Sequence, residues 1–122
     1  MLTQSAIDGY KVCIFAYGQT GSGKTFSMFG SDAVLRDPAD DVHASSRGLV
    51  LRAAAALLDG LAGGDVSVSF LEVYNDRLHD LLGGATGPAG TRPSLPLREA
   101  AASGVCVEGL SRRQVSSIAE VA

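Results

Sequence analysis

Residues 18–25 read GQTGSGKT and combine glycines, hydroxyl side chains and one lysine in the pattern GxxxxGK(S/T). Gly18 and Gly23 allow tight turns and close approach of the backbone to a phosphate, which larger side chains would block. The loop amides then face an anion, Lys24 supplies a positive charge for β- and γ-phosphates, and the Thr25 hydroxyl can bind Mg²⁺. The pattern therefore predicts a phosphate-binding loop for a nucleotide.

Such a loop needs a strand before it and a helix after it. The preceding KVCIFAY, residues 11–17, is almost entirely apolar and contains β-branched and aromatic residues, which is typical of a strand covered on both faces in a largely parallel sheet. The following KTFSMF, residues 24–29, is typical of the start of a helix. A glycine turn without a ligand is the alternative interpretation, but it has no need of a buried strand in front of it.

Helices and loops are expected to alternate beyond the loop. Residues 30–48 contain Pro38, several aspartates and no sustained periodicity, which predicts a long surface loop. Residues 49–61 are rich in alanine and predict a helix that ends at the following glycines. Its apolar face is predicted to comprise Val50, Ala53, Ala54, Leu57, Leu58 and Leu61.

The second half of the chain predicts strands and short helices. Residues 65–75, DVSVSFLEVYN, predict a strand, and NDRLHDLL predicts a short helix with Asn75 as its N-cap. The glycine- and proline-rich residues 83–94 predict a flexible linker. LPLRE and GVCVEGL predict two strands around the turn AASG, and SSIAEVA predicts the first turns of a helix capped by Ser116 or Ser117.

Composition excludes several classes of function. The formal net charge is −3 and no basic stripe is present, which argues against nucleic-acid binding. No apolar run reaches the roughly 18 residues that a membrane span needs, and the N-terminal residues lack a signal-peptide pattern. Cys13 and Cys106 are isolated, which predicts buried reduced thiols rather than a metal or redox site. We therefore expect no membrane, and a cytoplasmic location.

Hydrolysis requires groups that the chain does not offer. No apolar strand ends in an aspartate that could hold the Mg²⁺ shell, and Glu72, inside the apolar stretch SFLEVYN, is interpreted as a structural carboxylate. The catalytic residues are therefore unknown from this sequence.

Three segments carry a resemblance to a known family. DGYKVCIFAYGQTGSGKTFSMFG, SFLEVYNDRLHDLL and, more weakly, LPLREAAASGVCVEGL resemble kinesin motor domains and occur in the kinesin order. The resemblance implies an α/β fold: a P-loop NTPase with the kinesin-like motor fold and an incomplete central sheet flanked by helices. Residues 1–122 would be a partial motor domain truncated at both ends. The first segment is more similar to minus-end-directed kinesins with a C-terminal motor.

The resemblance also implies functional residues and partners. Contacts to ATP would come from Gly18, Gln19, Thr20, Gly21, Ser22, Gly23, Lys24 and Thr25, with Thr25 on Mg²⁺ and Phe26 near the base. Residues 31–47 would be the variable loop of the family. Microtubules would be the partner, contacted through Arg98, Arg112 and Arg113, and the location would be the cytoskeleton. The Ser-Ser-Arg of HASSRG, residues 43–48, resembles a phosphate-sensing segment but occurs too early, so Ser45 and Ser46 are interpreted as loop and helix-cap residues.

The resemblance leaves the activity of the chain itself to be decided. The parent would hydrolyse ATP and move along microtubules, whereas the chain lacks both nucleotide-sensing segments and is expected to be inactive alone. The alternatives are a P-loop phosphotransferase, which should carry an arginine-rich lid, and a truncated product without catalysis. Residues 83–94 offer only Arg92 for such a lid.

Overall fold

The computed structural model describes residues 2–38, 41–61, 63–84, 91–100 and 104–121. The chain divides into two compact units, and each is described by itself. One unit comprises Met1–Val66 and Val115–Ala122, and the other comprises Ser67–Gln114. In the described part of the chain, no helix combines the length and the apolar character that crossing a membrane would require.

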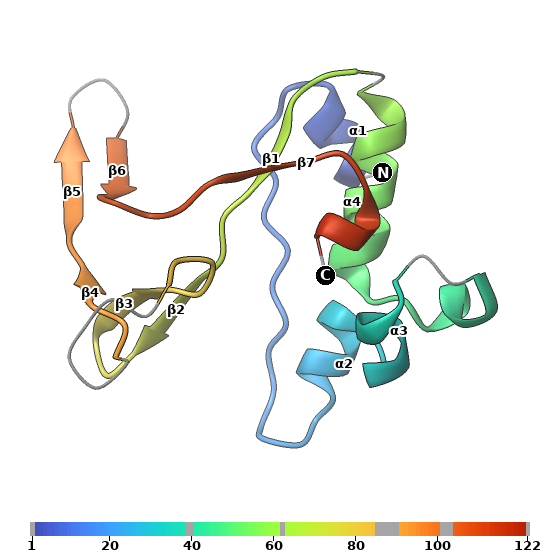
Figure 1. The fold of residues 1–122 in the computed structure, drawn as a ribbon, viewed down its shortest axis with the longest axis horizontal. Helices are drawn as coiled ribbons and strands as arrows, with labels where there is room; N and C mark the ends of the chain where they lie inside the picture. Colours follow the sequence, from blue (N-terminus) through green and yellow to red (C-terminus); the bar gives the residue numbers. More distant parts are fainter. Residues whose placement is uncertain (1, 39–40, 62, 85–90, 101–103, 122) are drawn as a thin grey trace. The chain divides into compact units, whose positions relative to one another are not determined.

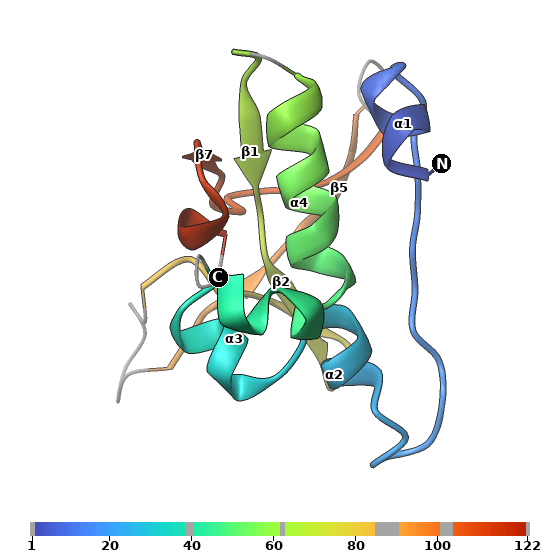
Figure 2. The same ribbon diagram turned by 90° about the vertical axis from the view of Figure 1, so that its right-hand side faces the viewer.

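The first unit is built around one alanine-rich helix, α4. Figures 1 and 2 show α4 with α1 beside it and with α2 and α3 near the end at which α4 begins, and α4 contacts α1, α2 and η3. Its elements are α1 (Leu2–Ile7), α2 (Lys24–Phe29), α3 (Asp32–Arg36), η1 (Asp41–Ser46), α4 (Leu49–Gly60) and η3 (Ile118–Glu120).

The buried core of this unit is small. Val34 of α3 and Leu51 of α4 are the two fully buried large side chains among the described residues, and Ala54 and Val115 are also buried. The sequence placed Ala54 correctly on the buried face of α4 but missed Leu51. The other five residues of the predicted face are only half-buried.

Residues 11–17 do not form the predicted strand. They run as an extended segment without regular pairing between α1 and the glycine loop, as Figure 1 shows in blue. Phe15 and Tyr17 are 82% and 95% exposed, and Tyr10 is 72% exposed. A strand requires neighbours that accept and donate its backbone hydrogen bonds, and no described segment pairs with this one. The prediction of a strand at residues 11–17 is therefore wrong for the described part of the chain.

The predicted loop of residues 31–47 contains regular structure. Helix α3 and the 3₁₀-helix η1 lie within it, and Ser31 is the N-cap residue of α3 without a side-chain capping bond. Asp32 in the first turn and Arg36 in the last turn suit the helix dipole. These charges favour a short helix that the absence of long-range periodicity concealed. Residues 39 and 40 lie outside the described residues.

The second unit consists of short strands. Strand β2 (Leu71–Tyr74) pairs antiparallel with β3 (Arg77–Asp80), which also pairs with β4 (Ser94–Leu95). Strands β5 (Leu97–Ala100) and β6 (Gly104–Val107) form a separate antiparallel hairpin. A two-stranded sheet pairs β1 (Val66–Val68) with β7 (Arg113–Val115), and its residues Val66 and Val115 belong to the first unit. The two strands predicted in LPLRE and GVCVEGL are confirmed, and most of the turn between them lies outside the described residues.

A β-turn replaces the helix predicted to begin at Asn75. Asn75 and Asp76 have φ values of 47° and 58°, and the strands on either side pair with Tyr74 opposite Arg77. Two central residues with positive φ define the type I′ turn, whose twist matches that of a two-residue hairpin, and asparagine and aspartate adopt this conformation at low cost. Leu78 and Asp80 lie two residues apart in strand β3, on the same face of the strand. The segment therefore follows the spacing of a strand and not the helical spacing that the sequence suggested.

Asp80 is the buried charge of the second unit, at 9% exposure. Its carboxylate accepts hydrogen bonds from the backbone N–H groups of Leu82 at 2.9 Å and Ser111 at 2.8 Å. The hydroxyl of Ser111, followed by the backbone N–H groups of Ser111, Gly83 and Leu82, outweighs desolvation and lowers the pKa of Asp80 to about 2. Asp80 therefore fastens the end of β3 to the segment before β7.

Two further predictions concern segment ends. Ser94, assigned to the flexible linker, belongs to strand β4, and residues 85–90 of that linker lie outside the described residues. Ser117 is the N-cap residue of η3 but makes no capping bond with its side chain. Instead, the N–H and the hydroxyl of Ser116 both donate to Glu120 Oε2, at 2.6 and 3.1 Å, which lowers the pKa of Glu120.

Candidate nucleotide-binding site

The glycine loop precedes α2 as the sequence predicted. Gly23 is the N-cap residue of α2 and lies in the left-handed region, with φ 87° and ψ 14°. Gly18 also has positive φ, and a Cβ atom there would come within 2.5 Å of Ser22 Oγ. Both positions required by the pattern therefore have a backbone conformation that disfavours a side chain.

Lys24 is the first residue of α2 and is half-buried. Its ammonium group folds back over the loop and donates hydrogen bonds of 2.7 Å to the carbonyl oxygens of Gly18 and of Gln19. A lysine ammonium carries three donors and holds its charge on a flexible stem. The two contacts keep this charge at the loop, where an anion held by the loop would meet it.

The remaining loop residues are open to solvent. Gln19, Thr20, Gly21, Ser22 and Thr25 are exposed, and the N–H of Ser22 donates to the Gln19 carbonyl at 3.2 Å, which closes a turn within the loop. Phe26 is 61% exposed. Glycine turns, exposed hydroxyls and a tethered ammonium are the donor set that suits a polyphosphate and its cation, so the residues present fit such a ligand.

The family model for the kinesin motor domain matches residues 1–122, which is the whole chain. The chain belongs to the kinesin motor domain family. Its fold is accordingly the P-loop NTPase fold of kinesins, in which the described helices and strands form one part. The phosphotransferase alternative is thereby set aside.

Individual kinesins are similar over most of the chain. Mouse kinesin-like protein KIF13A is 39% identical over 127 residues, covering 98% of this chain and 6% of that protein. Rice kinesin-like protein KIN-14R is 39% identical over 122 residues, covering 95% of this chain and 11% of that protein. Carboxy-terminal kinesin 2 of Xenopus laevis is 45% identical over 89 residues, covering 67% and 13%. Since the relatives include KIF13A as well as a carboxy-terminal kinesin, the similarity to C-terminal motors stays a prediction.

Solved kinesin structures share the fold. A KIF14 dimer with AMP-PNP in complex with a microtubule matches with a TM-score of 0.79 and 35% identity, covering 98% of this chain and 31% of that chain. A fast kinesin matches with a TM-score of 0.74 and 31% identity, covering 97% and 32%. The chain thus spans about a third of these solved kinesin chains.

Glu72, Ser45 and Ser46 are the remaining residues considered for a role in catalysis or phosphate sensing. Glu72 is exposed in β2 and lies opposite His79 of β3. The described residues contain no group of three or more His, Cys, Asp or Glu placed to hold a metal ion. Ser46 closes η1, and the N-cap residue of α4 is Gly48, so the helix-cap role expected of Ser45 and Ser46 is wrong.

The three arginines expected to face a microtubule are exposed in the second unit. Arg98 forms an ion pair with Glu108 at 2.7 Å, with both side chains more than half exposed. Arg113 donates to the Leu82 carbonyl at 2.9 Å. A surface ion pair of this kind contributes little to stability, so Arg98 can exchange its partner for another carboxylate.

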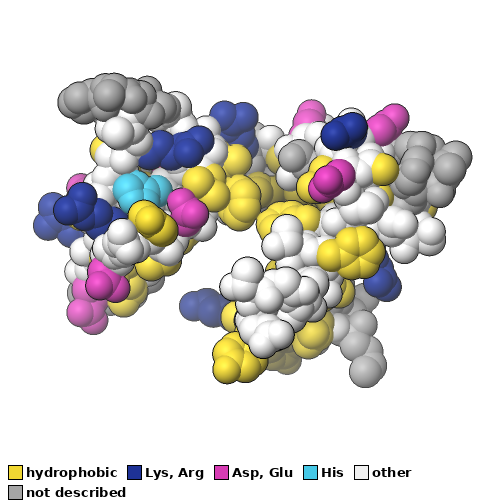
Figure 3. Space-filling view, turned by 90° about the horizontal axis from the view of Figure 1, so that it is seen from below, with side chains coloured by type: hydrophobic (Ala, Val, Ile, Leu, Met, Phe, Trp, Pro, Cys, Tyr) yellow, Lys and Arg dark blue, Asp and Glu magenta, His cyan; other side chains and the backbone are white. Residues whose placement is uncertain are grey.

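The two cysteines contradict the expectation of burial. Cys13 and Cys106 are both free and exposed. Cys13 lies in the unpaired extended segment and Cys106 in the two-stranded β5–β6 hairpin, and neither element is covered on the side where the thiol lies. Figure 3 shows the same effect more widely, since hydrophobic side chains, in yellow, reach the surface of the described residues.

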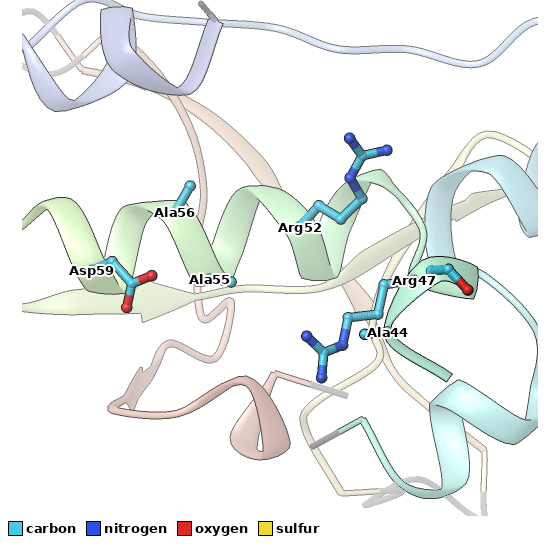
Figure 4. A pocket seen from close by; sticks show the side chains of 7 residues that line it. Ala44, Arg47, Arg52, Ala55, Ala56 and Asp59 are labelled. Carbon is cyan, nitrogen blue, oxygen red and sulfur yellow. The ribbon is translucent and has the colours of Figure 1, made fainter. Parts of the chain in front are cut away.

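The first unit contains a pocket that sequence patterns did not reveal. A pocket of about 630 Å³ lies between the end of the 31–47 segment and α4, and Figure 4 shows Arg47 from the former and Arg52 and Asp59 from the latter. Ala44, Ser45, Ala55 and Ala56 complete its lining. Arg47 Nε is buried without a hydrogen-bond partner. The residues that line this pocket lie between positions 44 and 59 but match no recognisable motif, which is why the sequence alone did not indicate the pocket.

Proposed function

We propose that residues 1–122 are the ATP-binding segment of a kinesin microtubule motor. The protein that carries them within a complete motor domain, called here the parent motor domain, would hydrolyse ATP to move along microtubules. The observation that carries the proposal is the loop itself: glycines at the two required turns and the Lys24 ammonium tethered 2.7 Å from two loop carbonyl oxygens.

Each loop residue has a role in this proposal. The backbone from Gly18 to Gly23 would surround the phosphates, because glycines let the chain approach them closely. Lys24 would leave its carbonyl partners to bind β- and γ-phosphate oxygens, and the exposed hydroxyl of Thr25 would bind Mg²⁺. When bound, Mg²⁺ neutralises phosphate charge. The exposed ring of Phe26 would lie near the base.

Two similar solved structures support a nucleotide and a microtubule as binding partners. KIF14 is described in complex with a microtubule, once with AMP-PNP and once with ADP. We extend these partners to the parent motor domain, with Arg98, Arg112 and Arg113 as contacts to the acidic tubulin surface. The place of action would be the microtubule cytoskeleton in the cytoplasm.

The test of nucleotide binding is the Lys24→Ala variant of the parent motor domain. Loss of a charged donor to the phosphates should weaken the binding of a fluorescent ATP analogue by about 100-fold. Lys11→Ala removes an exposed lysine outside the loop and is the matched control, with unchanged affinity expected. Unchanged affinity in Lys24→Ala would contradict the proposal.

A further inference from the structure

The 31–47 segment is closed at its base by a backbone contact. Gly30 and Arg47 form an isolated antiparallel bridge, and the N–H of Ser31 donates to the carbonyl oxygen of Ser46 at 3.4 Å. We name residues 30–31 and 46–48 the neck. Gly30 and Gly48 are both buried there. The end of α2 and the start of α4 are therefore held together although a long segment separates them in the sequence.

Neither Gly30 nor Gly48 has room for a side chain. A Cβ atom on Gly48 would come within 2.5 Å of the backbone nitrogen of Gly30, and still closer to Met28 O. A Cβ atom on Gly30 would lie 2.8 Å from the backbone nitrogen of Gly48, and φ at Gly30 is +96°. The obstacles are backbone atoms, which cannot rotate away as the end of a side chain can. An atom added at either glycine must therefore push residues 30–31 and residues 46–48 apart.

Separation of the neck displaces both helices that begin or end there. The N–H of Gly30 donates to Phe26 O at 2.7 Å, and the N–H of Arg52 donates to Gly48 O at 3.1 Å. Helix α2 has only six residues, and Ser27 N–H in turn bonds to Gly23 O at 2.9 Å. A movement of Gly30 thus reaches the glycine loop through two consecutive hydrogen bonds of one short helix.

We infer that Gly30 and Gly48 are positioning residues for the phosphate loop: their close backbone contact sets where α2, and with it Lys24, is held. This inference rests on the proposed function, because it assumes that the loop binds a nucleotide. It adds that nucleotide affinity depends on the closure of a neck that lies outside residues 18–25. Ligand binding and neck closure then stabilise each other reciprocally.

The test uses Gly48→Ala in the parent motor domain, with Gly84→Ala as the matched control. A Cβ atom added to Gly84 would meet no other atom within 4 Å, and its φ is not positive, so this substitution should leave affinity unchanged. Gly48→Ala should weaken the binding of the fluorescent ATP analogue by about tenfold, within the usual range of coupling between sites. Wild-type affinity in folded Gly48→Ala, or loss of affinity only in proportion to the unfolded fraction, would overturn the inference.

A measurement on the unaltered protein covers the case in which Gly48→Ala does not fold. Hydrogen exchange of the Ser31 amide is followed with and without the ATP analogue. Protection at Ser31 on binding is expected, and protection confined to residues 18–25 would overturn the inference. Failure of the proposed function is separate, because Lys24→Ala would then bind the analogue normally whatever the neck does.

Discussion

The backbone nitrogen of Ser111 lies 2.8 Å from the carboxylate of Asp80, which lies 31 residues earlier in the chain. The Ser111 hydroxyl also bonds to this carboxylate and is the largest cause of its lowered pKa. The same carboxylate holds the N–H of Leu82, so one ionised group joins β3, the residues after it and the segment before β7.

This arrangement predicts a specific acid sensitivity. The pKa of Asp80 falls from 3.8 to about 2 on folding, so ionised Asp80 stabilises the folded state above about pH 4. This stabilisation is lost as the pH falls from about 4 to 2. NMR titration of the Asp80 carboxyl should show the low value, and Ser111→Ala should raise it. An ordinary value near 3.8 in the unaltered protein would contradict the hydrogen-bond account.

The turn at Asn75 and Asp76 predicts opposite effects for two substitutions. Asp76→Gly should be tolerated or stabilising, whereas Asp76→Ala should weaken the β2–β3 hairpin by about 1 kcal/mol, because alanine is strained at a φ of 58°. Hydrogen exchange of the hairpin amides should accelerate roughly fivefold in the alanine variant. At Asp65, where φ is not positive, glycine should bring no such advantage over alanine. Equal exchange in both Asp76 variants would argue against the type I′ turn.

The extended segment at residues 11–17 predicts association of the isolated chain. Phe15 and Tyr17 are largely exposed, and the unpaired backbone beside them can pair with another copy. The average molar mass of the 122-residue chain, measured by light scattering, should rise with concentration. Replacing both rings by serine should reduce this rise more than the same change at Phe26, an exposed ring on α2. A monomeric chain with a cooperative thermal transition would refute this prediction.

Local chemistry explains which parts of the structure the sequence predicted. The glycine loop, α2 and α4 follow from short-range rules: glycine at turns, alanine in helices and a helix after the loop. The prediction of a strand at residues 11–17 was wrong because strand formation depends on neighbouring strands that come from elsewhere in the sequence. The apolar sequence predicted burial there, but no described segment pairs with it.

Other failures arose where two local rules compete. Leu78, Leu81 and Leu82 have helical spacing, yet the turn preference of Asn75 and Asp76 decided the outcome in favour of a hairpin. The neck was not predicted, since Gly30 and Gly48 lie at opposite ends of a segment without periodicity and only the folded backbone brings them together. The candidate site was thus predictable from its motif, but the contact that we infer to position it was not.

The most direct measurement of the central claim is microtubule-stimulated ATP hydrolysis. The parent motor domain should hydrolyse ATP faster as microtubules are added, Lys24→Ala should abolish this turnover, and Lys11→Ala should retain it. The 122-residue chain alone should show negligible stimulated turnover, because no nucleotide-sensing segment was recognised in it. A parent motor domain without microtubule stimulation, or robust stimulated turnover by the 122-residue chain, would contradict the account.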